Sequence, residues 1–113
     1  KQNNKKAFYA KKITKTEAKI NWNEKATSIV AKINGLNPSP GAWFEVNKKR
    51  YKIWRSEVSE LNGKPGIILD KKLTIACKEK SIRIIEIQKE GKKKLSIDEF
   101  LKGTQILVGS KIT

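Results

Sequence analysis

The sequence predicts a mainly β domain with one or two helices, because the spacing of its apolar residues changes once along the chain. Between Trp22 and Leu36 apolar residues recur at the spacing of an α-helix. After Pro40 the period falls to two, and short apolar runs separated by charged turns follow. The 113 residues suit a single domain. We expect residues 1–8 to be the end of a linker and residues 9–113 to form the domain.

The N-terminal segment carries weaker signals. Phe8–Ile13 is expected to be extended, and Thr14 and Glu17 have the spacing of a capping box, which predicts a brief helical turn before Ile20. The chain begins with Lys1 and contains no Met. We therefore expect that an upstream part of the protein is missing.

The helix is the most strongly predicted element. Its apolar face comprises Trp22, Ala26, Ile29, Val30, Ile33 and Leu36. Asn21 or Asn23 is suited to cap its start, and Glu24 to interact with the positive end of the helix dipole. Gly35 and the following Pro38 are typical of a helix end.

Short strands are expected over the rest of the chain. They are Ala42–Val46, Arg50–Val58, Ile67–Leu69, Leu73–Cys77, Ile82–Gln88 and Ile106–Val108. Residues 47–49 between the first two are expected to form a hairpin turn. The isoleucines at 84, 85 and 87 are almost unbroken, which predicts that protein covers both faces of that strand.

A second capping box, from Ser96 to Glu99, is expected to open a short helix that ends near Gly103. One capped helix, about six short strands and this short helix predict an OB-like, partly open β-barrel. Closure of a barrel hides strand edges that a small sheet would otherwise leave unpaired.

Charge is the most prominent feature of the composition. The chain has 26 Lys and Arg against 11 Asp and Glu, a net charge of +15. Such a field attracts polyanions, and nucleic acid is favoured over a membrane surface. Biased genomic base composition is the alternative, because nearly all the cations are Lys. No apolar run is long enough for a membrane span or a signal peptide, and the single Cys allows no intrachain disulfide, so we expect a cytoplasmic protein.

Catalytic residues, metal ligands and cofactor-binding residues are not expected in this segment. The sequence contains no His, which removes the commonest general base and metal ligand. Cys77 is the only cysteine and lies in an apolar run, which predicts a buried structural thiol.

Basic residues interleaved with an aromatic residue form the candidate nucleic-acid site. On a strand, Arg50, Lys52 and Trp54 share one face, which is suited to hold a phosphate and a ribose or base. An amphipathic edge strand kept soluble by its cations is the alternative. The turn 90–94 carries three adjacent lysines that suit a phosphate backbone, with a solvated turn as the alternative. The predicted nucleic-acid-binding residues are Lys11, Lys12, Arg50, Lys52, Trp54, Arg55, Lys92, Lys93 and Lys94.

Three phrases, in this order and spacing, go beyond composition: residues 9–22, which contain YAKKI and EAKINW, residues 36–43, LNPSPGAW, and residues 87–93, IQKEGKK. Together they resemble the C-terminal domain of methionyl-tRNA formyltransferases, over essentially the whole chain from Tyr9 to about Ile112. The resemblance implies a helix from Asn23 to Gly35 and a positive surface on the strand of Lys52 and on residues 91–93.

The resemblance also implies a function for the parent enzyme. Members of this family transfer a formyl group from 10-formyltetrahydrofolate to the amino group of methionyl-tRNA in translation initiation. A missing N-terminal Rossmann-like domain would hold the folate and the catalytic Asn, His and Asp. The present domain would bind the tRNA, so methionyl-tRNA and the missing domain are the implied partners. The chain departs from the family pattern at Asn21, Asn34, Leu95 and the turn 78–80, and Asn34 puts a tRNA contact from the helix end in doubt.

Three other interpretations stay open. The chain can be the C-terminal barrel of another formyltetrahydrofolate-dependent formyltransferase or hydrolase, whose surface has no reason to be this basic. It can be a freestanding OB module that binds nucleic acid, which would be expected to line up more exposed aromatics than Trp43 and Trp54. It can also be a structural module whose charge reflects genome composition alone.

Overall fold

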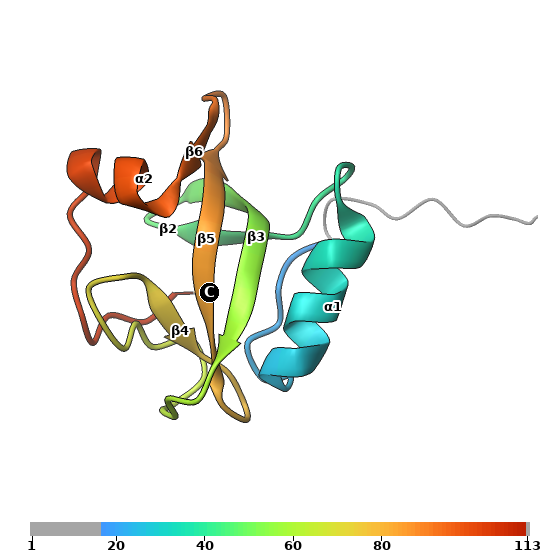
Figure 1. Cartoon of the computed structure of the whole chain (residues 1–113), viewed down its shortest axis with the longest axis vertical. Coiled ribbons are helices and arrows are strands. Elements are labelled where there is room, and N and C mark those ends of the chain that lie inside the picture. The colour runs from blue at the N-terminus through green and yellow to red at the C-terminus, as the bar shows by residue number, and fades with distance from the viewer. Residues whose placement is uncertain (1–16, 113) are drawn as a thin grey trace, which may run out of the picture.

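The computed structural model describes residues 17–112 (Figure 1). Several predictions concern residues outside this range. They are the extended segment Phe8–Ile13, the capping box that begins at Thr14, and the site residues Lys11 and Lys12. The elements in chain order are α1 (Ala26–Leu36), β2 (Trp43–Val46), β3 (Lys49–Ser59), β4 (Thr74–Ala76), β5 (Ser81–Lys89), β6 (Lys94–Ser96) and α2 (Ile97–Gly103).

The five strands form one antiparallel sheet in the order β2-β3-β5-β4, and β6 also pairs with β5. β3 occupies one edge of β5 along its length, and β4 and β6 share the other edge. The sheet curls into a partly open barrel, with α1 beyond β3 and α2 on the opposite side beside β6 (Figure 1). The prediction of a mainly β, OB-like barrel with a helix before the sheet and a short helix after it is confirmed.

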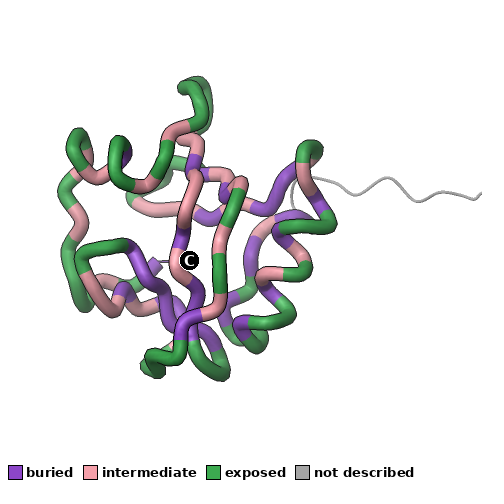
Figure 2. The backbone as a smooth tube through the Cα atoms, in the orientation of Figure 1, coloured by how far each residue is buried: buried purple, intermediate pink, exposed green. Residues whose placement is uncertain are grey.

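The core lies between the curled sheet and the two helices (Figure 2). Four aromatic rings connect its two sides: the ring of Phe44 lies 6.0 Å from Trp22 and 5.6 Å from Tyr51, and Tyr51 lies 5.6 Å from Phe100 on α2. The largest fully buried side chains are Phe44, Ile29, Ile33, Ile53, Ile75, Ile82, Ile84, Ile87, Thr74, Cys77 and Ser81.

The start of α1 differs from the prediction. The helix begins at Ala26, its N-cap residue is Lys25, and no side chain caps it. The side-chain oxygen of Asn21 instead accepts from the backbone N–H of Asn23, 3.0 Å away, in a turn before the helix. The N–H of Ala26 donates to the carbonyl of Glu79 at 3.1 Å. A backbone group from the β4–β5 turn thus replaces the predicted asparagine cap, and the predicted role of Glu24 in the first turn is wrong.

Two predicted strands are not formed. Residues 67–69 and 106–108 contain no strand, and only isolated bridges join Ile67 to Lys111 and Ile68 to Ile75. The carbonyl of Leu107 accepts from the N–H of Ser110 at 3.1 Å, so a turn interrupts the last apolar run. Leu107 is 65% exposed, so this run does not supply a core strand.

Strand β6 was not expected, because Lys94–Ser96 is too polar and too short for the pattern to identify it. Strand β5 alternates more than its sequence indicates: Ile84 and Ile87 are fully buried, but Ile85 is only partly buried. The expectation of protein cover on both faces of β5 is therefore met only in part.

Other local predictions are confirmed. The hairpin between β2 and β3 turns at Asn47 and Lys48, both with positive φ, as two-residue hairpins of this type require. Ser96 caps α2 by accepting from the N–H of Glu99 at 3.2 Å. Cys77 is buried. Within residues 17–112, no helix has the length and apolar character required to span a membrane.

Candidate nucleic-acid interface

The outer face of the sheet carries a row of four side chains, one from each of four strands. Trp43 on β2 pairs with Lys52 on β3, Lys52 pairs with Gln88 on β5, and Gln88 pairs with Lys94 on β6. These residues face outward because their neighbours on β3, such as Tyr51, point into the core. Strand pairing therefore brings together residues that are far apart in the sequence.

Two of the cations on this face lie over the indole ring of Trp54. The ammonium group of Lys52 lies 3.9 Å from the centre of the indole ring, and that of Lys94 lies 4.8 Å from it. The negative face of an aromatic ring attracts cations at these distances. The sequence predicted that Trp54 would lie beside cations, and the structure adds that its ring surface is shared by two ammonium groups.

Trp43 forms a second cluster of the same kind. The guanidinium carbon of Arg50 lies 4.4 Å from the centre of the Trp43 ring, and the ammonium group of Lys19 lies 5.5 Å from it. Lys19 precedes α1 and lies beside the sheet because its backbone forms an isolated parallel β-bridge with Trp43. Two indoles thus position four cations on one surface.

Gln88 connects the first cluster to the β5–β6 turn. Its side-chain oxygen accepts a hydrogen bond of 2.8 Å from the indole Nε1 of Trp54, and its Nε2 donates at 2.7 Å to the carbonyl of Lys92. Both ends of the amide are therefore used. The turn that carries Lys92 and Lys93 is tied to the strand that carries Trp54.

The side chain of Lys52 is held from the other side. Its ammonium group donates to the carbonyl of Pro38 in the loop after α1, and its desolvation lowers the pKa of Lys52. The Lys52 side chain passes close to Gly41, where a Cβ atom would lie 2.2 Å from Cε of Lys52. Gly41 also has a φ of +83°, a conformation that favours glycine, whereas the end of the flexible Lys52 side chain could move to make room for a Cβ atom.

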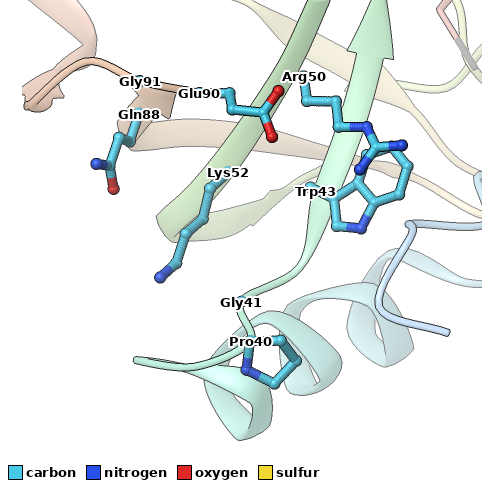
Figure 3. Close-up of a pocket in the computed structure, with 8 residues that line it drawn as sticks. All are labelled: Pro40, Gly41, Trp43, Arg50, Lys52, Gln88, Glu90 and Gly91. Atoms are coloured by element: carbon cyan, nitrogen blue, oxygen red, sulfur yellow. The ribbon is translucent and has the colours of Figure 1, made fainter. Parts of the chain in front are cut away.

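A small pocket of about 230 Å³ lies on this face between the loop after α1 and the β5–β6 turn (Figure 3). The lining residues are Pro40, Gly41, Trp43, Arg50, Lys52, Gln88, Glu90 and Gly91. Figure 3 shows the guanidinium of Arg50 against the ring of Trp43. The pocket therefore adjoins both cation clusters.

Several lysines on this face have no ion-pair partner in the part of the chain that the structure describes. Among residues 17–112, no ion pair involves Lys52, Lys92, Lys93 or Lys94. At the same end of the barrel, the charge of Lys49 lowers the pKa of Lys89, and desolvation and the charge of Lys92 act in the same direction. This mutual repulsion would be relieved by a bound anion.

The structure brings only some of the predicted residues together. Arg50, Lys52, Trp54 and Lys94 lie in the two clusters, and Lys92 joins them through Gln88.

Arg55 and Lys93 are less closely connected to these clusters. The guanidinium Nε of Arg55 lies 4.0 Å from a carboxylate oxygen of Glu86, which offsets part of its charge. Lys93 is exposed in the turn. The sequence analysis missed Gln88 and Lys19, and it did not assign Trp43 to the site. The two-residue hairpin turn, which sets Trp43 opposite Lys52, is the signal that could have identified Trp43.

Neither a metal site nor an accessible thiol nucleophile is found among the described residues. Among residues 17–112 no three side chains of His, Cys, Asp or Glu gather where they could hold a metal ion. The one thiol, Cys77, is buried on the inner side, and burial raises its pKa to about 11. The arrangement is suited to binding an anion.

Comparison with known proteins identifies the family. The model described as "Formyl transferase, C-terminal domain" matches residues 12–105. The chain is 51% identical over 108 residues to the methionyl-tRNA formyltransferase of Pelagibacter ubique, a match that covers 95% of this chain and 35% of that protein. It is 46% identical over 109 residues to the enzyme of the same name from Bradyrhizobium diazoefficiens, covering 93% of this chain and 35% of that protein. The chain thus spans about a third of the length of these curated relatives.

Solved structures support the fold. HypX from Aquifex aeolicus in complex with tetrahydrofolic acid superimposes with a TM-score of 0.69 at 20% identity, covering 96% of this chain and 23% of that one. A multiply substituted variant of the same protein gives a TM-score of 0.67 at 23% identity, covering 91% of this chain and 20% of that one. With the family model covering most of the chain, this protein belongs to the formyl transferase C-terminal domain family.

Proposed function

We propose that this chain is the C-terminal, tRNA-binding part of a methionyl-tRNA formyltransferase. Residues 9–113 would form the binding domain and residues 1–8 the end of a linker. An N-terminal Rossmann-like domain, outside this chain, would hold 10-formyltetrahydrofolate and perform formyl transfer to the amino group of methionyl-tRNA. The enzyme would act in the cytoplasm during translation initiation.

One observation carries the tRNA-binding role: two indoles hold four cations on a single outer face of the sheet. The pair Lys52 and Lys94 on Trp54 lies beside lysines of the β5–β6 turn that have no ion-pair partner among residues 17–112. Lysine acts on phosphate as a point charge, so this surface is suited to follow a backbone rather than to read base sequence.

The similarity to proteins named methionyl-tRNA formyltransferase favours this function over the barrel of another formyltransferase or hydrolase. The cation clusters argue against a freestanding single-strand-binding module. Such a module stacks successive bases on open aromatic faces, whereas Trp43 and Trp54 both have cations over their rings.

Binding measurements with the chain test the proposal. Initiator tRNA and an unstructured single-stranded RNA of equal length should be titrated at several salt concentrations by fluorescence anisotropy. We expect tRNA to bind more tightly and its affinity to fall linearly with salt on logarithmic axes, because phosphate contacts release counterions. Tighter binding of the single strand would favour the freestanding module. An affinity for tRNA that does not change with salt would contradict the proposal.

A further inference from the structure

One of the side chains that line the pocket beside the two cation clusters is a carboxylate, that of Glu90. The backbone N–H of Glu90 donates to the carbonyl of Arg50 at 2.9 Å, so the two residues are neighbours across β3 and β5. Figure 3 shows the Glu90 carboxylate and the Arg50 guanidinium turned to the same pocket. Among residues 17–112 no cation lies within ion-pair distance of Glu90.

This carboxylate decides what chemistry the pocket accepts. A phosphate placed against Glu90 would be repelled, although lysines nearby attract phosphate. A carboxylate accepts hydrogen bonds only, so its partner must present N–H or O–H groups. The group that fits against Glu90 therefore carries hydrogen-bond donors.

Size and shape narrow the choice further. The volume of about 230 Å³ lies below the range of roughly 300–1,000 Å³ that is usual for whole small ligands, so the pocket suits one ring system. The guanidinium of Arg50 lies 4.4 Å from the Trp43 ring and is exposed at the pocket. Unstacked bases in RNA stack on such guanidinium planes and are hydrogen-bonded along their Watson–Crick edges.

From this geometry we propose that the pocket binds one unpaired guanine base of the RNA that lies across the outer face. Guanine presents two adjacent N–H donors, N1–H and the N2 amino group, which match the two oxygens of the Glu90 carboxylate. Uracil presents a single N–H between two carbonyl oxygens, which the carboxylate repels. The base stacks on Arg50, while the backbone on either side follows the lysines. The inference rests on the proposed function, because it requires RNA on this face.

Short oligonucleotides of equal charge separate base recognition from backbone attraction. The chain should be titrated with an all-uridine strand, a strand with one central guanosine and a strand with one central adenosine. We expect the guanosine strand to bind about tenfold more tightly than all-uridine, as a bidentate base contact allows. The adenosine strand should resemble all-uridine, since adenine lacks the paired donors. Equal binding of guanosine with uridine, or of guanosine with adenosine, would overturn the inference.

Glu90→Gln supplies the decisive variant. The amide keeps the shape of the side chain but replaces one acceptor by a donor, so the guanosine preference should disappear while all-uridine binding is retained. The matched control is Glu45→Gln, which removes the same charge from the residue opposite Arg50 on β2 and should keep the preference. Loss of preference in both variants would assign the effect to net charge and would also overturn the inference.

These outcomes are distinct from failure of the proposed function. If the strands bind with equal, salt-dependent affinity and tRNA binds tightly, the RNA-binding face stands and only the guanine pocket is lost. If neither tRNA nor any strand binds at low salt, the proposed function itself fails, and the inference fails with it.

Discussion

The indole Nε1 of Trp54 donates a hydrogen bond to the side-chain oxygen of Gln88, 2.8 Å away, and the amide nitrogen of Gln88 donates one to the carbonyl of Lys92. One side chain on β5 thereby joins an aromatic residue on β3 to the lysine-rich turn before β6. The position of that turn relative to Lys52 and Lys94 depends on this chain of hydrogen bonds as well as on local turn geometry.

Replacement of Gln88 by Leu should weaken tRNA binding about fivefold. The variant keeps the volume of the side chain and removes both hydrogen bonds, each of which contributes about 1 kcal/mol. Affinity measured by anisotropy at low salt checks this, with the melting temperature as the test of folding. Trp54→Phe removes the N–H donor and leaves a smaller ring for Lys52 and Lys94, so it should show a loss at least as large. If both variants bind tRNA as the parent chain does, the turn does not depend on Gln88.

Neutralising Lys92, Lys93 and Lys94 together, each to Gln, should reduce the salt slope of tRNA binding by roughly 2 to 3 units if each lysine meets a phosphate. The slope comes from the dependence of the logarithm of the binding constant on the logarithm of salt concentration. The matched control changes Lys64, Lys78 and Lys80 to Gln, because these exposed lysines lie near the other end of β5. A slope unchanged by the first set, or reduced equally by both, would remove the turn from the interface.

Much of the fold follows from local pattern. The helical spacing before Pro38, the alternation along β3, the hairpin at residues 47–48 and the cap at Ser96 all depend on residues close together in the sequence. These features were predicted because short-range sterics and hydrogen bonding determine them. The period of the pattern also identified correctly which face of β3 points outward.

The predictions that failed concern features that depend on contacts between residues far apart in the sequence. The cap of α1 comes from the carbonyl of Glu79, which no pattern near Ala26 reveals. Residues 106–108 are apolar enough for a strand, yet a turn ends that run and leaves Leu107 exposed. Gln88 could not be assigned to the site, because its partner Trp54 lies 34 residues away and meets it only through the pairing of β3 with β5.

Removal of the cap on α2 should destabilise the domain. Ser96→Ala deletes the oxygen that accepts from the N–H of Glu99, and we expect the free energy of unfolding to fall by about 1 kcal/mol. Chemical denaturation measures this change. Thr27→Ala, at an exposed position in the first turn of α1, should be neutral or slightly stabilising, because Ala has the higher helix propensity. An unchanged unfolding free energy for Ser96→Ala would show that the cap contributes nothing.

Cys77 should make the stability of the domain depend on pH in the alkaline range. Burial raises the pKa of its thiol from an ordinary value of 9.0 to about 11 in the folded state, so the folded chain keeps a proton that the unfolded chain loses. Well below pH 9.0 the thiol is protonated in both states and has no effect. As pH rises from 9.0 towards about 11, the unfolded state binds fewer protons than the folded state, and the free energy of unfolding falls.

Lysine and tyrosine side chains titrate in the same range, so the effect of Cys77 must be isolated by comparison with Cys77→Ala. The free energy of unfolding should be measured for both chains across this pH window. The variant will have lost some core packing at every pH, but its stability should fall less steeply with pH than that of the parent chain. In parallel, an aromatic disulfide reagent should label Cys77 at neutral pH only slowly while the chain is folded, because the thiolate is disfavoured and the side chain is buried. Identical slopes for the two chains, together with rapid labelling of the folded protein, would show that the thiol is neither buried nor shifted.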